Sequence, residues 1–265
     1  MQYVLGIDIG STASKAVIMT YDREIYAKTV VPHGTGSIGP KQVYEKILSE
    51  NNLKKEDLSR ILVTGYGRFV FDDADNQKSE ISCHAKGINF LNPEVRTIID
   101  IGGQDVKAIR LNEKGMILNF VMNDKCAAGT GRFLDTMANI LNVKTSELGS
   151  LSEKAEKVVT ISNTCTVFAE SEVISQLSNN VRLEDLVAGI NKSVAKRVAS
   201  LAFRVGIATE VAMSGGVALN KGVVKSLSEE LKIDIFVHED CQFAGALGAA
   251  LFALEELEKK GDAIT

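Results

Sequence analysis

Two short stretches of the chain share a pattern of residues suited to holding phosphate. They are Gly6-Ile-Asp-Ile-Gly-Ser-Thr-Ala-Ser-Lys15 and Ile98-Ile-Asp-Ile-Gly-Gly-Gln-Asp-Val-Lys107, whose aspartates lie 92 residues apart. In each stretch an apolar run ends at an aspartate, with glycine two residues later and lysine seven residues later. Glycine allows the positive φ of a tight turn and lets the backbone approach a ligand closely. We therefore expect backbone N–H groups to point at phosphate oxygens, in the first copy those of Gly10, Ser11, Thr12 and Ala13.

The charged side chains of the two copies suit a nucleotide bound with magnesium. Asp8 and Asp100 end their strands, and carboxylates there bind Mg²⁺ directly or through water, because this ion prefers oxygen ligands. Lys15 neutralises phosphate as a point charge. One copy alone is equally well explained by an ordinary β-hairpin with a tight turn. Two copies at matched spacing weaken that explanation, and their long period indicates two similar subdomains rather than a solenoid.

Other glycine-rich segments give one further candidate and one that we exclude. In residues 213–220 a strand runs into Gly215-Gly216 and a helix is expected to begin, so that its N-terminus offers free N–H groups to an anion. The small-residue segment 245–250 is expected to be a core helix. Residues 34–39 match the G-x-G-x-x-G of dinucleotide-binding folds, but the next strand ends at Val63-Thr64-Gly65 without the required acidic residue. NAD binding is therefore not expected.

Two of the four cysteines lie where a thiolate would be stabilised. Cys126 precedes a loop that leads into a helix, and Cys165 opens another, so the helix dipole favours their ionised forms. A [4Fe-4S] cluster needs four thiolates, and these two lie 39 residues apart, which by spacing alone does not indicate a cluster. Cys83 and Cys241 are expected to be buried structural residues, and His84 to be packed or solvated.

The elements that position these residues alternate between strands and helices, which predicts an α/β fold with mixed sheets. We expect one lobe from residues 1–95 with 245–265 and a second from residues 96–244. The expected strands are 3–9, 16–20, 24–31, 60–64, 96–101, 105–111, 116–122, 158–161, 211–214 and 233–237. The expected helices are 40–52, 79–91, 130–141, 165–178, 183–205, 221–231 and 243–260.

Composition narrows the class of protein. The chain has 265 residues, 45% of them hydrophobic, a net charge of -4 and a pI of about 5.6. The chain has no excess of basic residues that would indicate binding to nucleic acid. No apolar run reaches the roughly 20 residues of a membrane span. The N-terminus lacks the basic region of a signal peptide. We expect a cytoplasmic protein without disulfides.

Several motifs together resemble a known family. Asp8-Ile-Gly-Ser-Thr12, Asp100-Ile-Gly-Gly-Gln104 and Ser214-Gly-Gly216 resemble the phosphate and adenosine motifs of the acetate kinase, sugar kinase, heat-shock chaperone and actin superfamily. In that fold ATP lies in the cleft between two ribonuclease-H-like lobes. More narrowly, residues 64–68, 101–107, 123–135 and 164–172 resemble the BadF/BadG-type ATPases, which include activators of 2-hydroxyacyl-CoA dehydratases and subunits of benzoyl-CoA reductase. The resemblance covers essentially the whole chain.

The resemblance implies a function and a set of site residues. It implies a cytoplasmic homodimer of amino-acid fermentation that binds ATP or ADP with Mg²⁺ and takes one electron from reduced ferredoxin or flavodoxin. One [4Fe-4S] cluster, bound by Cys126 and Cys165 of both subunits, passes this electron to the dehydratase. The nucleotide ligands that it implies are Gly10, Ser11, Thr12, Ala13, Ser14, Lys15, Gly102, Gly103, Gln104, Asp135, Gly215, Gly216, Asn220 and Gln242.

Gln104 stands where many ATPases of the superfamily have an acidic residue. Glutamine positions water but is a poor base, so we expect slow hydrolysis until the partner binds, with Gln104, Asp8 and Asp100 as the catalytic residues. ATP that binds the closed state more tightly would shift the population toward it.

Two other functions are compatible with the loops. A small-molecule, sugar-type kinase of the same fold would need an additional aspartate as base, and none stands out. A nucleotide-dependent assembly or chaperone module would leave Cys126 and Cys165 unexplained. Iron–sulfur absorption is expected only for the electron-transfer function.

Overall fold

The computed structural model describes residues 3–162 and 164–260. Met1, Gln2, Asn163 and residues 261–265 lie outside the described part, and with them the ends of the first expected lobe. The chain divides into two compact units. Unit 1 takes the chain up to Glu94 and again from Gln242, and unit 2 is Val95–Cys241.

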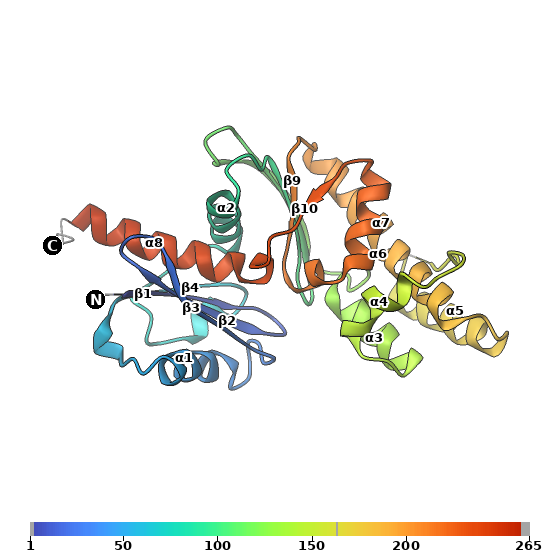
Figure 1. Cartoon of the computed structure of the whole chain (residues 1–265), viewed down its shortest axis with the longest axis horizontal. Helices are drawn as coiled ribbons and strands as arrows, with labels where there is room; N and C mark the ends of the chain where they lie inside the picture. The colour runs from blue at the N-terminus through green and yellow to red at the C-terminus, as the bar shows by residue number, and fades with distance from the viewer. Residues whose placement is uncertain (1–2, 163, 261–265) are drawn as a thin grey trace. The chain divides into compact units, whose positions relative to one another are not determined.

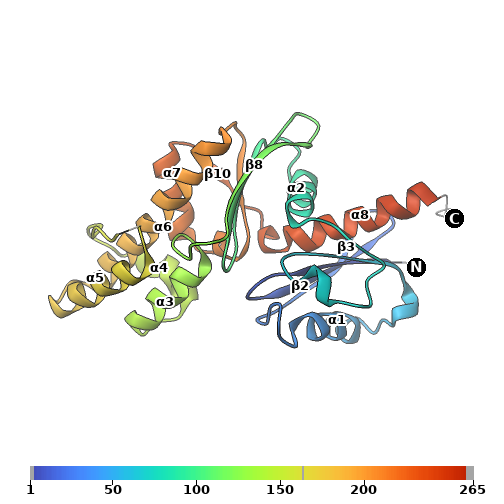
Figure 2. The same ribbon diagram turned by 180° about the vertical axis from the view of Figure 1, so that it is seen from behind.

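Unit 1 is built on a five-stranded sheet with the order β3-β2-β1-β4-β5 (Figure 1). The first three strands pair antiparallel, whereas β4 and β5 continue the sheet in parallel from β1. Helix α1 covers one face, and α2 and α8 pack together on the other (Figures 1 and 2). The bounds are β1 Tyr3–Ile9, β2 Ser14–Thr20, β3 Ile25–Val31, β4 Leu58–Thr64, β5 Asn76–Gln77, α1 Gly39–Glu50, α2 Glu80–Leu91 and α8 Ala244–Lys260.

The packing of unit 1 follows from its sequence. All seven residues of β1 are buried, as a continuous apolar run predicts for a central strand covered on both faces. Gly6 lets α8 approach closely, because a Cβ there would lie 2.1 Å from the Ala246 carbonyl oxygen. Gly248 does the same between α8 and α2, where a Cβ would lie 1.8 Å from the Cys83 carbonyl oxygen. The small-residue segment 245–250 is thus a core helix face, as expected.

Unit 2 repeats the sheet of unit 1 strand for strand. Its order is β10-β9-β6-β7-β8, with β6, β7 and β8 antiparallel and β9 and β10 parallel to β6. Helices α6 and α7 pack together, and α6 lies against β7 and β8 (Figure 2). The bounds are β6 Thr97–Ile101, β7 Val106–Leu111, β8 Ile117–Asn123, β9 Val211–Ser214, β10 Ile235–Phe236, α3 Gly131–Leu141, α4 Leu148–Ser152, α5 Thr166–Ser178, α6 Leu183–Val205 and α7 Lys221–Leu231.

The expected strand at 158–161 is wrong. This segment has no regular secondary structure. It is hydrogen-bonded to the first turn of α6 instead. The Asp185 carboxylate accepts hydrogen bonds from the N–H groups of Glu156 and Lys157, and the Asp185 carbonyl accepts one from Val159. Ile161 is buried in the core of unit 2, but backbone groups of the segment are satisfied by a helix rather than by a neighbouring strand. Within the described residues, no helix is both long and apolar enough to span a membrane.

Candidate functional site

The loop between β1 and β2 closes on itself through its first glycine. The Gly10 N–H donates to the Ala13 carbonyl over 3.0 Å, and the Gly10 carbonyl accepts from the Thr35 N–H over 2.9 Å. The Gly10 N–H is therefore occupied, contrary to the expectation that it points at a ligand. Among the described residues, the N–H groups of Ser11 and Thr12 have no hydrogen-bond partner. These two amides, at the tip of the turn, are the ones available to an anion.

Asp8 is buried beside this loop and has one unsatisfied oxygen. Its side chain pairs with Lys15, the residue opposite it on β2, with the ammonium 3.2 Å from Oδ2. Oδ1 is buried without a hydrogen-bond partner in the described chain. Gly65, at φ +92°, keeps the neighbourhood of Oδ1 clear, because a Cβ there would lie 2.4 Å from it. A buried, unsatisfied carboxylate oxygen is costly, so Asp8 fits a site for a cation such as Mg²⁺, which takes oxygen ligands.

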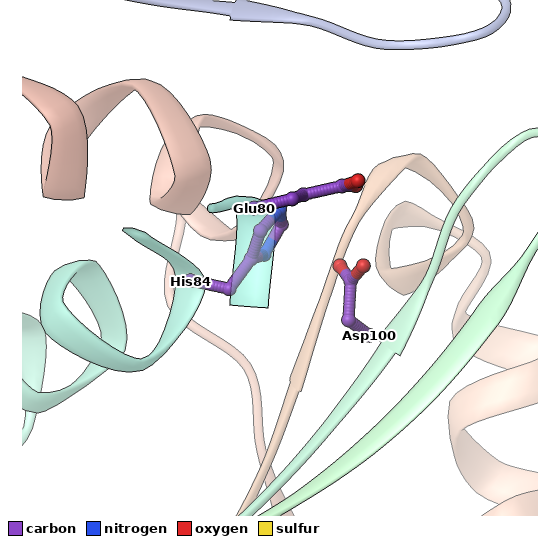
Figure 3. Close-up of side chains that lie close together, drawn as sticks. All are labelled: Glu80, His84 and Asp100. Carbon is purple, nitrogen blue, oxygen red and sulfur yellow. The ribbon is translucent and has the colours of Figure 1, made fainter. Parts of the chain in front are cut away.

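Helix α2 places the titratable side chain of His84 beside Asp8 and carries a second titratable group, Glu80. Glu80 and His84 lie one helical turn apart on α2 (Figure 3), and His84 is buried. A Cβ on Gly245 would lie 2.9 Å from His84 Nε2 and 3.1 Å from Asp8 Oδ2. The imidazole is thus packed beside the Asp8 carboxylate at Gly245. No signal in the sequence indicated that His84 would lie beside Asp8. This approach depends on the packing of α2 against α8 on one face of the sheet.

Cys83 lies on the same helix and is inert. Burial is the largest of several effects that raise the pKa of its thiol to about 12, and a hydrogen bond with Thr64 opposes the shift. The side chain therefore stays protonated, as the structural role expected for Cys83 requires.

The second loop, between β6 and β7, has the same turn as the first. The Gly102 N–H donates to the Asp105 carbonyl over 2.9 Å, just as Gly10 does to Ala13. The carbonyls of Gly102 and Gly103 accept from the first N–H groups of α3, those of Gly131 and Arg132, over 2.9 and 2.8 Å. Gln104 is exposed at the tip of the turn. This loop is therefore tied to the start of α3.

The ionic contacts of the second loop differ from those of the first. Asp100 Oδ1 accepts from the Ser214 hydroxyl over 2.9 Å, and Oδ2 lies 3.3 Å from the Lys107 ammonium. Lys107 also contacts Asp105 at 2.6 Å, and its side chain is only 1% exposed, against 15% for Lys15. Lys107 is held inside the protein between two carboxylates, whereas the side chain of Lys15 reaches the surface. The matched spacing of the two lysines did not predict this difference. The sequence did contain a sign of it, because the second copy has a carboxylate, Asp105, where the first copy has Ala13.

The third glycine segment leads through a short turn into the helix predicted at residues 221–231. Gly216 begins a short 3-10 helix, Gly216–Leu219, and α7 starts only at Lys221. Asn220 caps α7, accepting from the Gly222 and Val223 N–H groups over 3.0 and 3.2 Å, so this helix N-terminus is not open to an anion.

The two glycines themselves have different surroundings. Gly215 needs its φ of +84°, and a Cβ there would lie 2.3 Å from the Ile101 carbonyl oxygen. At Gly216 a Cβ would meet nothing within 4 Å. The exposed backbone of Gly216 is thus accessible to a ligand. Ser214-Gly215 after β9 also corresponds to Thr64-Gly65 after β4, a match between the copies that the sequence analysis did not make.

Asp135 and Gln242, the last expected nucleotide ligands, are both half-buried. Asp135 lies on α3, and its Oδ1 accepts from the Thr145 hydroxyl over 2.7 Å. Gln242 lies in the 3-10 turn Cys241–Phe243 that precedes α8. Ser14, expected in the same set, is buried on β2 and donates from its hydroxyl to the His33 carbonyl over 2.8 Å.

Unit 2 carries two thiols of a different kind from the rest. Cys126 and Cys165 are free and half-buried, whereas Cys241 is fully buried in the core. Cys165 is the N-cap of α5, and its sulfur makes no hydrogen bond to the first turn. Cys126 lies in the loop between β8 and α3, five residues before Gly131, so it precedes a loop that leads into a helix, as expected. Its carbonyl accepts from the Asn123 side-chain amide over 3.1 Å.

Comparison with known proteins places the chain among ATPases. The model of the BadF/BadG/BcrA/BcrD ATPase family matches residues 5–253. The chain is 55% identical to a 2-hydroxyisocaproyl-CoA dehydratase activator of Clostridioides difficile, over 97% of each chain. It is 57% identical to an activator of lactoyl-CoA dehydratase of Anaerotignum propionicum, over 97% of this chain and 100% of that one.

Solved structures that resemble the chain include a relative of the same kind. The activator of the 2-hydroxyisocaproyl-CoA dehydratase from Clostridium difficile with bound ADPNP has a TM-score of 0.97 and 54% identity, covering 100% of this chain and 98% of that one. A ROK family glucokinase from Streptomyces griseus, in complex with glucose and AMPPNP, has a TM-score of 0.59 at 12% identity, covering 96% and 99%. The second likeness concerns the fold alone. Together with the family match and the more similar activator, it confirms the predicted fold class, α/β with two mixed sheets.

Proposed function

The chain belongs to the BadF/BadG/BcrA/BcrD ATPase family, and we propose that it is an ATP-dependent one-electron donor that activates a 2-hydroxyacyl-CoA dehydratase. The observation that carries this proposal is the pair of free, half-buried thiols, Cys126 and Cys165, in a chain that also has two phosphate loops. An ATPase or kinase needs the loops but has no use for such thiols. Activators of dehydratases are also the relatives at 55% and 57% identity.

The phosphate loops are proposed to bind ATP or ADP with Mg²⁺. The N–H groups of Ser11 and Thr12 and the ammonium of Lys15 contact phosphate, and the open backbone of Gly216 contacts the nucleoside. Asp8 is the main carboxylate for Mg²⁺, because its Oδ1 is buried and lacks a partner within the described chain, and Asp100 assists. Other contacts are proposed from Ala13, Ser14, Gly103, Gln104, Asp135, Gly215, Asn220 and Gln242. Gly10 and Gly102, whose N–H groups are occupied within the loops, are proposed to let the backbone approach the nucleotide closely.

Hydrolysis is proposed to be slow in the isolated chain. Gln104 is exposed at the tip of the second loop, where its amide orients the attacking water. It does not remove a proton from that water, since an amide is not a base at neutral pH. Slow hydrolysis keeps the nucleotide intact until the partner is bound.

The thiols fit half of the ligand set of a [4Fe-4S] cluster. Both Cys126 and Cys165 lie in unit 2 and are free and partly accessible, and α5 stabilises a thiolate at its N-cap. Cys83 and Cys241 do not fit, because both are fully buried and the Cys83 pKa is raised to about 12. Four thiolates are required, so a homodimer completes the set. When bound, the cluster supplies storage for one electron.

The partners follow from this chemistry. The electron is proposed to come from reduced ferredoxin or flavodoxin and to go to the dehydratase of an amino-acid fermentation. Free thiols suit the reducing cytoplasm, where we place the protein. No observation favours the sugar-type kinase, since the likeness to a glucokinase is one of fold.

Purification without oxygen tests the proposal. The wild-type protein is expected to contain iron and sulfide, to show the visible absorption of an iron–sulfur protein, and to reduce a dehydratase only with ATP. Cys126→Ser and Cys165→Ser are expected to lose the iron, while the matched Cys83→Ala keeps it, because the Cys83 thiol is fully buried and belongs to unit 1. Absence of iron from the wild type, iron retained in both serine variants, or electron transfer without ATP would each refute the proposal.

A further inference from the structure

Helix α6 and the strands beside it border an open cavity of about 450 Å³ in unit 2, which is within the size range of ligand sites. It lies between the second half of α6 and the adjoining ends of β7 and β8. Buried apolar residues of α6, Val198 and Leu201, line it together with Val106 at the start of β7. Lys196, Arg197 and Arg204 bring three cations to it, and no acidic residue lines it.

These cations are not neutralised by the chain. In the part of the chain that the structure describes, Lys196, Arg197 and Arg204 take part in no ion pair. Lys192, one turn earlier on the same helix, contacts both Glu229 and Glu230, at 3.5 and 3.0 Å. The first half of α6 is thus compensated and the second half is not, in a protein whose net charge is -4. The helix dipole accounts for a cation at Arg204, close to the C-terminus, but not for Lys196 and Arg197.

The cavity adjoins the loop that carries Cys126. Asn123, which lines the cavity, donates from its side-chain amide to the Cys126 carbonyl over 3.1 Å. Gly129, in the same loop, lies against α6, because a Cβ there would be 2.9 Å from the Arg197 Cγ. Whatever binds beside Arg197 and Asn123 therefore stands next to the backbone of a proposed electron-accepting thiol.

The arrangement suits a protein surface better than one small anion. Lys196, Ser200 and Arg204 follow each other at intervals of one turn and are all exposed, so they extend along about 12 Å of helix. Two exposed apolar side chains flank this line, Phe203 on α6 and Met122 on β8. Aromatic, methionine and arginine side chains are enriched in protein interfaces.

We propose that this cavity and its cations dock the acidic surface of the protein that delivers the electron. The inference rests on the proposed function. Transient electron-transfer complexes are small, and charge complementarity speeds their formation, which an uncompensated line of cations beside Cys126 provides. The carrier is oxidised by one electron as the group held by Cys126 and Cys165 is reduced by one.

The test reverses two exposed charges and leaves the loop contact of Arg197 intact. Lys196→Glu with Arg204→Glu is compared with Lys225→Glu with Lys232→Glu, two exposed lysines of α7 and its C-cap that make no ion pair among the described residues. Both double variants change the net charge equally. Iron content and circular dichroism check that each folds, and Lys196→Gln with Arg204→Gln gives a milder change should the first variant fail to fold.

Two measurements are made with an acidic bacterial ferredoxin and a flavodoxin as probes. The first is the stopped-flow rate of reduction by the reduced carrier, and the second is the Kd of the oxidised carrier, which needs no turnover. The cavity variant is expected to be reduced at least about tenfold more slowly at low salt and to bind more weakly. The difference should disappear in about 1 M salt, where the Debye length is about 3 Å. The control variant is expected to match the wild type.

The outcomes separate this inference from the proposed function. Equal rates and Kd values for the cavity and control variants would overturn the docking inference, as would a loss confined to transfer to the dehydratase. Reduction by methyl viologen radical is expected in every variant. If even the wild type is not reduced by it, the proposed function fails rather than the docking site.

Discussion

Replacing Lys107 by methionine is expected to destabilise unit 2 more than the matching change at Lys15 destabilises unit 1. Lys107 lies between Asp100 and Asp105, and the side chains of Lys107 and Asp100 are 1% and 2% exposed. Removing one partner of a buried ion pair costs about 3–5 kcal/mol, because a charge is left buried and uncompensated. The side chain of Asp105 is 19% exposed, so water can solvate its carboxylate once Lys107 is removed. The destabilisation should therefore lie at the lower end of this range.

The change at Lys15 should cost less, because 15% of its side chain meets solvent, against 1% for Lys107. We expect about 1–3 kcal/mol for leaving Asp8 without this partner. For units of this size, 1 kcal/mol corresponds to about 2–4 °C in Tm. The transition of Lys107→Met should therefore fall by roughly 10 °C, and calorimetry of the nucleotide-free protein measures it.

Ligand affinity should show the opposite order. Lys15→Met is expected to weaken ATP binding by about 10–100-fold, the value of a charged hydrogen bond, whereas Lys107→Met should stay within about threefold of the wild type below its Tm. Adding Asp105→Asn to Lys107→Met removes one uncompensated charge and should restore part of the stability. Equal Tm values for the two lysine variants, or no recovery in the double variant, would refute the assignment of different roles to the two copies.

Three other outcomes follow from the same geometry. Asp8→Asn should lower the affinity for Mg²⁺-ADP at least about tenfold and Asp100→Asn less, which titration calorimetry with and without EDTA measures; equal losses would contradict the leading role of Asp8. Gly215→Ala should cost about 1–3 kcal/mol through its positive φ, whereas Gly216→Ala should leave urea unfolding unchanged and weaken ATP binding, and the reverse order would be contrary evidence. Burial raises the pKa of Cys83 from 9.0 to about 12, so the unfolded thiol ionises first and stability should fall as pH rises from 9 toward 12. This loss should be smaller in Cys83→Ala, and identical slopes in urea unfolding would count against it.

The sequence was sufficient for the features that depend on local pattern. Aspartate and lysine seven positions apart, around a four-residue turn, must face each other across a hairpin, and Asp8 and Asp100 do pair with Lys15 and Lys107. Helices with clear apolar periodicity were placed within a residue or two, and Leu183–Val205 was predicted to the residue. Each of these follows from contacts within about ten residues of chain.

The features that were missed depend on contacts between distant segments. The glycine at 245 that brings His84 beside Asp8 has no local signal. Likewise, nothing near residue 158 indicates that Asp185 accepts from backbone groups there. Single-sequence patterns record which side of an element is buried, but not what buries it.

The two copies of the loop differ in the contacts that surround them. This difference fits the roles proposed for them, binding of metal and phosphate by the first and coupling to Cys126 by the second. Behind the first loop is a buried carboxylate oxygen with no partner in the described chain, whereas the second is tied by the carbonyls of Gly102 and Gly103 to the N–H groups that open α3. The segment just before α3 is closed by Thr130, whose N–H and hydroxyl both donate to the Ala127 carbonyl, next to Cys126. A displacement of Gly103 must therefore move the start of α3 or break hydrogen bonds worth about 1 kcal/mol each. The second loop, which carries Gln104, is thus connected to the segment next to Cys126 by hydrogen bonds. A change in the position of this loop should therefore shift the segment that carries the Cys126 thiol, while the first loop remains free to hold the metal and phosphate.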